Sequence, residues 1–116
     1  MDNEILNDVK MHIEGSTVDD HFDGVLIDYI NTTFMVLYQM GVGDQTKPFK
    51  ISLNQKVKWT DFLDDNSLEG VKEYMYRRVQ MMFDPPTSSN ALEASKDILS
   101  EMEWRINAYA DYKDSF

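Results

Sequence analysis

Apolar residues return every three or four positions in four stretches of this chain, which is the spacing of the buried face of an α-helix. The stretches cover about residues 3–14, 17–40 and 66–84, and a last one begins around residues 88–90. The longest face consists of Val18, Phe22, Val25, Leu26, Tyr29, Ile30, Thr33, Leu37 and Met40. The last stretch presents Leu92, Leu99, Met102, Ile106 and Tyr109. The pattern therefore predicts four helices.

Residues that favour helix ends stand at the limits of these stretches. Thr17 and Asn66 are expected N-caps, and Glu69 follows Asn66 at the third position, as in a capping box. Pro85 and Pro86 end the third helix, because proline disfavours α geometry in the residue before it.

The stretch between the second and third helices lacks helical spacing. Phe49, Ile51 and Leu53 alternate with Lys50 and Ser52, which is typical of a short half-buried strand. Residues 56–59 are the candidate strand partner. We therefore expect a β-arm or a structured loop over about residues 44–58.

These elements predict one mainly α domain. With 116 residues and 42% apolar side chains, the chain has the length and composition for a single core. We expect a four-helix bundle-like domain over residues 1–116, with the arm between helices two and three. Residues 111–116 continue no pattern and are expected to be a loosely held tail.

The composition excludes several classes of function. The net charge is −10, which repels phosphate and argues against tight non-specific nucleic-acid binding by the whole surface. The absence of cysteine excludes thiol catalysis, cysteine-ligated zinc and disulfides. No stretch has the roughly 20 apolar residues of a membrane span, and the acidic N-terminus is unlike a secretory signal. We expect a protein made in the cytoplasm, without a membrane partner.

No catalytic or metal constellation stands out. Asp19, Asp20 and Asp23 are best interpreted as acidic residues at the positive end of a helix. His12 and His21 are nine positions apart on different expected helices, unlike a metal pair. We therefore expect no cofactor, no metal and no enzymatic activity.

Charge is segregated along the chain. Residues 1–40 carry eight acidic side chains and one lysine, whereas residues 41–58 carry one aspartate and four lysines. The basic island has three interpretations: edge protection of a strand, docking on an acidic surface such as a neighbour's N-terminal helices, or phosphate contact. Eight methionines and fourteen aromatic side chains also exceed what one small core readily absorbs, which favours oligomerisation.

Two runs of residues carry a resemblance to a known family. Residues 71–89, which include Phe83-Asp84-Pro85-Pro86, and residues 101–107, Glu-Met-Glu-Trp-Arg-Ile-Asn, resemble the C-terminal half of head–tail connector (neck adaptor) proteins of tailed bacteriophages and prophages. The N-terminal half and the middle agree in shorter blocks, at residues 5–10, 29–31, 38–43 and 59–63. Residues 44–58 and the tail have no counterpart in this pattern.

The resemblance implies a structural virion protein. Such adaptors are helical, form a ring of usually twelve copies below the portal protein, contact a downstream neck or tail completion protein, and let DNA pass through the lumen. The expected location is the neck of the virion, after synthesis in the bacterial host. An acidic lumen would let DNA slide, because Lys and Arg contacts to phosphate would hold it.

The resemblance and the charge pattern together nominate structural and interface residues. We expect Trp104 to lie in the core or against a neighbouring subunit, and we prefer the core. We expect Glu103 and Arg105 to form an ion pair beside it. The structural keys are Phe83, Pro85, Pro86, Trp104 and Arg105, and the inter-subunit candidates are Phe49, Lys50 and Ile51. The alternative function is a monomeric acidic binding module, such as a phage-encoded inhibitor or a mimic of DNA charge. A small helical hydrolase has no candidate catalytic residue.

Overall fold

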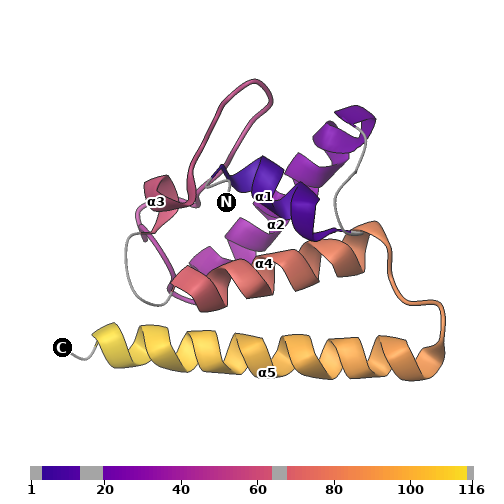
Figure 1. Ribbon diagram of the computed structural model, residues 1–116. Coiled ribbons are helices and arrows are strands. Elements are labelled where there is room, and N and C mark those ends of the chain that lie inside the picture. Colours follow the sequence, from indigo (N-terminus) through magenta and orange to yellow (C-terminus); the bar gives the residue numbers. More distant parts are fainter. Residues whose placement is uncertain (1–3, 14–19, 64–67, 115–116) are drawn as a thin grey trace.

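The fold is built from helices around one central helix. The computed structural model describes the backbone of residues 4–13, 20–63 and 68–114, and the side chains up to residue 110. Its elements are α1 (Ile5–His12), the 3₁₀ turn η1 (Asp20–Phe22), α2 (Asp23–Gln39), α3 (Trp59–Phe62), α4 (Leu68–Phe83) and α5 (Ser89–Asp114), shown in Figure 1. The prediction of a mainly α fold is confirmed.

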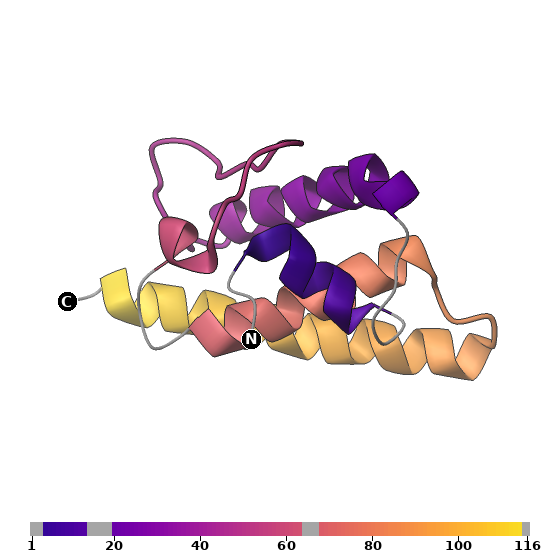
Figure 2. The same cartoon turned by 45° about the horizontal axis from the view of Figure 1, so that its top comes forward.

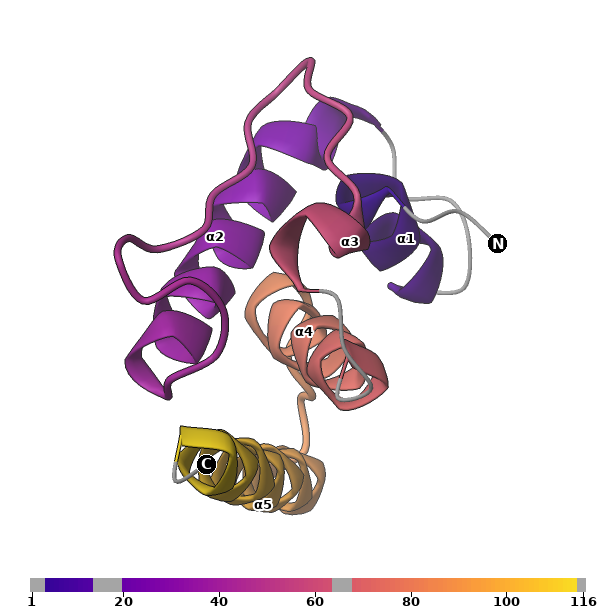
Figure 3. The same ribbon diagram turned by 90° about the vertical axis from the view of Figure 1, so that its left-hand side faces the viewer.

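Helix α4 is the hub of the arrangement. It contacts α1, α2 and α5, and α1 also contacts α2. Helix α5 runs antiparallel to α4 on the side away from α1 and α2, as Figure 2 and Figure 3 show from two further directions. The loop between α2 and α3 starts near the end of α5, but its far end lies on the opposite side of the molecule from α5 (Figures 1 and 3).

The core forms where the apolar faces of α1, α2 and α4 meet. Its fully buried side chains include Ile5, Val9, Leu26, Ile30, Phe34, Leu37, Tyr74, Met75 and Val79. Within each helix most of these positions are three or four residues apart, and Tyr74 and Met75 are adjacent, so each helix turns one side inward.

The buried face of α2 starts later than the sequence predicts. Phe22 and Val25 are 40% and 42% exposed, and burial begins at Leu26. Residues 20–22 form a 3₁₀ turn before the α-helix begins, which changes the direction of the Phe22 side chain. Val25 is rotated by about 100° from Leu26 and lies on the outer side of α2. The ring of Phe22 packs edge-on against Phe83 instead, with the centroids 5.5 Å apart. The expected N-caps Thr17 and Asn66 lie outside the described residues.

The predicted β-arm is wrong, and the alternative of a structured loop describes residues 44–58. Among the described residues, the only β contact is an isolated bridge between Glu4 and Lys58. The side chain of Asn31 explains the difference: its Nδ2 donates to the Ile51 carbonyl at 2.9 Å, and its Oδ1 accepts from the Ile51 N–H at 2.8 Å. Because this amide takes both backbone groups of Ile51, no strand partner is needed there.

A buried carboxylate joins three helices. Asp8 on α1 is 4% exposed, and its Oδ2 accepts hydrogen bonds from Trp59 Nε1 at 2.7 Å and from the Tyr76 hydroxyl. The His12 ring stacks on the Tyr76 ring, with a centroid distance of 3.7 Å. Burial and the hydrogen bond to Asp8 raise the pKa of Tyr76 well above its usual value. This cluster fixes α1 and the start of α3 against α4.

The last helix also extends further than its apolar pattern. Helix α5 continues through residues 111–114 to Asp114, where the sequence predicts a tail without pattern. Ala110 is 7% exposed and lies against the turn that follows α2, where a Cβ on Gly41 would be 3.4 Å from the Ala110 Cβ. Gly41 has φ +91°, which favours glycine. The contact holds the helix close to its end.

Replacing Asp8 tests the importance of this cluster. Asp8→Ala leaves the buried Trp59 N–H without an acceptor, so we expect the free energy of unfolding to fall by roughly 2–4 kcal/mol. Asp8→Asn keeps one acceptor oxygen, so its free energy of unfolding should fall by less than that of Asp8→Ala. The exposed neighbour variant Asn7→Ala should change stability by less than about 0.5 kcal/mol. Urea denaturation followed by circular dichroism measures all three, and equal losses for Asp8→Ala and Asn7→Ala would contradict the prediction.

The raised pKa of Tyr76 predicts a loss of stability at alkaline pH. The folded-state pKa lies above the unfolded value of about 10, so the stabilisation is complete below pH 10 and is lost as pH rises above it. We expect the free energy of unfolding of the natural protein to fall more steeply from pH 9 to 11 than that of Tyr76→Phe. Urea denaturation at each pH gives both slopes. Identical slopes would rule out this role of the phenol.

Candidate assembly interface

The double-proline turn joins α4 to α5. The Asp84 N–H donates to the Gln80 carbonyl at 2.8 Å, and Pro85 and Pro86 then redirect the chain. The Ser88 Oγ accepts from the Ala91 N–H at 3.0 Å, which caps the start of α5. The helix end at the prolines and the next start near residue 88 are therefore confirmed.

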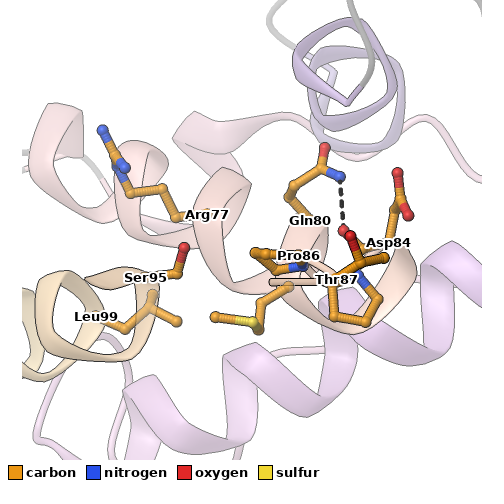
Figure 4. A pocket seen from close by; sticks show the side chains of 9 residues that line it. Arg77, Gln80, Asp84, Pro86, Thr87, Ser95 and Leu99 are labelled. Carbon is orange, nitrogen blue, oxygen red and sulfur yellow. Dashed lines mark hydrogen bonds between the residues drawn. The ribbon is translucent and has the colours of Figure 1, made fainter. Parts of the chain in front are cut away.

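A cavity of about 440 Å³ lies beside this turn, as Figure 4 shows. Both prolines, Met81 of α4 and Leu99 of α5 contribute apolar walls, and Arg77 lies at one edge. Phe83 is half-buried and packs against Phe22. The turn and its cavity thus belong to the α4–α5 hairpin and leave a recess at its closed end.

A polar contact in the seam between α4 and α5 fixes how the two helices lie. Glu103 Oε2 accepts from the Tyr74 hydroxyl at 2.7 Å and lies 3.4 Å from Arg78 Nη1. Burial and the bond to Glu103 raise the pKa of Tyr74 above its usual value. Leu99 is buried in the same seam, with Met102 and Ile106 half-buried beside it.

The preferred placement of Trp104 in the core is wrong. Its side chain is 72% exposed. Helical residues are rotated by about 100° each, so Trp104 lies about 160° from Ile106 and faces away from α4. The expected pair of Glu103 and Arg105 also does not form, because Arg105 Nη2 lies 2.8 Å from Glu101 Oε1, one turn away.

The loop residues nominated as inter-subunit contacts point in different directions. Phe49 is half-buried among aromatic rings, with its centroid 5.0 Å from that of Phe34 and 5.1 Å from that of Phe62. Ile51 is 5% exposed and belongs to the core. Lys50 is exposed. The inter-subunit role remains a prediction, and of these three side chains Lys50 is the one that solvent reaches freely.

The acidic residues near the start of α2 have a structural role. Lys10 Nζ lies 2.6 Å from Asp20 Oδ1 and 2.9 Å from Asp23 Oδ1. Burial lowers the pKa of Lys10, but the bonds to both carboxylates outweigh it and raise the pKa above its usual value. The bond from Lys10 in turn lowers the pKa of Asp20. Asp19 lies outside the described residues.

The described part of the chain contains neither a candidate metal site nor a candidate membrane span. None of its groups of His, Asp and Glu side chains has the three members that would hold a metal ion. None of its helices combines the length and the apolar composition needed to cross a membrane.

Comparison with known proteins supplies the family. A family model described as phage connector protein matches residues 5–113, which is nearly the whole chain. The chain belongs to the phage connector family. The connector role in joining phage head and tail follows from this membership, and the family favours a structural protein over an enzyme. No curated protein and no solved structure gave a match.

This connector presents two unlike exposed surfaces. One lies at the end of the 44–58 loop, where Leu53 is 55% exposed and Asn54 adopts φ +67°. The other is the outer side of α5 around Trp104. The sequence predicts Leu53 on the buried side of a strand, which is wrong, and it gives no role to the carboxylates of α5. Two sequence features could have indicated them. Leu53 is an apolar residue next to Asn54-Gln55 in a segment with several lysines, and the acidic residues of α5 recur every four positions.

The contacts between α4 and α5 predict that replacing Glu103 destabilises the protein more than replacing Glu101. Glu103→Ala removes the acceptor of the half-buried Tyr74 hydroxyl, so we expect a loss of about 1–2 kcal/mol in the free energy of unfolding. Glu101→Ala breaks only the exposed pair with Arg105 and should lose less than about 0.5 kcal/mol. Chemical denaturation of both variants checks the order, and a larger loss for Glu101→Ala would contradict it.

Proposed function

We propose that this connector is a neck adaptor, a protein that forms a ring between the portal and the downstream neck or tail completion protein. DNA passes through the lumen of the ring, and the protein resides in the virion neck after synthesis in the host cytoplasm. The family match over residues 5–113 carries this proposal. The proposal adds two features to the connector role: a location in the virion neck and assembly into a ring.

The distribution of exposed apolar side chains supports assembly. Closed rings need heterologous contacts, in which each subunit uses two different surfaces. Trp104 on α5 and Leu53 in the loop are both exposed. Helix α5 and the far end of the loop lie on opposite sides of the molecule (Figures 1 and 3). A large indole in water is unfavourable for a monomer, whereas Trp is enriched in the centres of protein interfaces.

The nominated structural residues fit a rigid subunit. Pro85 and Pro86 form the turn of the α4–α5 hairpin, and Phe83 braces the turn against η1. Arg105 is exposed beside Trp104 and is held by Glu101. We infer that the hairpin presents Trp104 and Arg105 as one preformed surface.

The net charge of −10 supports passage rather than capture of DNA. Non-specific DNA binding depends on Lys and Arg contacts to phosphate, and an acidic surface repels the duplex. A ring with an acidic lumen would keep DNA from adhering as it leaves the head.

A monomeric acidic binding module is the alternative. The exposed carboxylates of Glu93, Asp97 and Glu101 along α5 favour it, because a mimic of DNA charge needs acidic groups in a row. The basic loop on the opposite side argues against it, since it interrupts the acidic surface.

Mixing the purified protein with the portal of the same phage tests the proposal. We expect the portal to bind several copies of this chain in a defined number, measured by native mass spectrometry. The mixed sample decides, because adaptors that are monomeric alone can assemble on the portal. A chain that stays monomeric and ignores the portal at high micromolar concentration would refute the adaptor role and leave the alternative.

A further inference from the structure

The exposed loop end and the outer side of α5 are complementary in charge and in apolar character. The loop tip consists of Lys50, Leu53 and Lys56, and the outer α5 face consists of Glu93, Asp97, Glu101 and Trp104. We propose that the loop tip of one copy docks on the outer α5 face of the next copy. This rests on the proposed ring assembly and names the surfaces that make it.

The loop tip is held in place by contacts at its base. Asn31 fixes Ile51 through two hydrogen bonds, and the Ile5 N–H donates to the Val57 carbonyl at 2.8 Å. Between these anchors Ser52 Oγ bonds Gln55 Oε1 at 2.8 Å, which closes the turn below Leu53. A tip that is ordered before binding loses little conformational entropy when it docks.

The outer α5 face is one continuous strip. Residues 93, 97, 101 and 104 follow each other at intervals of four, four and three, so they share one side of the helix. All four are exposed, and Trp104 is 72% exposed. The strip thus combines three carboxylates with one large apolar side chain. Arg105 lies beside Trp104 and pairs with Glu101, so the net negative charge of the strip comes from Glu93 and Asp97.

The loop tip and the outer α5 face are complementary in charge to each other, but neither is complementary to a second copy of itself. Two lysines flank Leu53, and the carboxylates precede Trp104, so ion pairs can surround an apolar contact between Leu53 and the indole. Two loop tips repel each other, and so do two outer α5 faces. This disfavours two-fold pairing and favours head-to-tail contact.

Within one molecule the two surfaces cannot meet. The far end of the loop and α5 lie on opposite sides of α2 and α4, as the perpendicular views of Figure 1 and Figure 3 show. The partner for each surface must therefore be another molecule. A second copy of this chain always carries the matching surface.

Charge reversal on each side tests the pairing. The loop variant is Lys50→Glu/Lys56→Glu, the helix variant is Glu93→Lys/Asp97→Lys, and a third variant combines all four changes. Glu101 is kept so that its pair with Arg105 stays intact. The matched control is Asp28→Lys/Glu69→Lys, which makes the same change in net charge as the helix variant at exposed positions outside both surfaces and outside the double-proline turn.

We expect each half-reversal to weaken self-assembly at least tenfold, because like charges then face each other. The four-change variant should recover assembly, and so should an equal mixture of the two half-reversed proteins. Assembly is measured by native mass spectrometry, alone and on the portal. Trp104→Ala should also weaken assembly while leaving the urea midpoint unchanged, since its side chain is exposed.

The outcomes separate this inference from the adaptor role. If the natural protein assembles and the half-reversals have no effect, the pairing is wrong and the adaptor role stands. Weakening without recovery in the combined variant, or equal weakening by the control, overturns the pairing as well. If the natural protein does not assemble even on the portal, the adaptor role fails and the pairing fails with it.

Discussion

The buried carboxylate of Asp8 is the interaction on which the rest of the structure depends. A carboxylate at 4% exposure is unfavourable without donors, and here Trp59 and Tyr76 provide them. One residue of α1 is thereby joined to α3 and to α4. With α1 fixed, the Ile5 N–H reaches the Val57 carbonyl and holds the end of the loop.

The two exposed surfaces follow from this internal scaffold. The loop is tied to α2 by Asn31 and to α1 by Ile5, so it extends from the side of the molecule opposite to α5. Helix α5 is held on α4 by an apolar seam and by Glu103. A subunit with rigid, unlike ends is the form that head-to-tail assembly requires.

Much of the fold could be predicted because helical spacing is a local property. The helices appear where apolar residues recur every three or four positions, and the prolines end α4 as expected. The errors have causes that are distant along the chain. Alternation around Lys50 predicts a strand, but the Asn31 amide satisfies the backbone there. For Trp104 no local pattern distinguishes the core from a neighbouring molecule, so its orientation needed the position of α4.

By itself, the sequence determined the helical segments, the segregation of charge and the resemblance to phage connectors that the family match confirms. Only the tertiary structure decided which polar side chains are buried together and which apolar ones are left outside. Asp8 meets Trp59 and Tyr76 from 51 and 68 positions away. Such pairings depend on how helices pack in space, and spacing along the chain carries no information about partners so far apart.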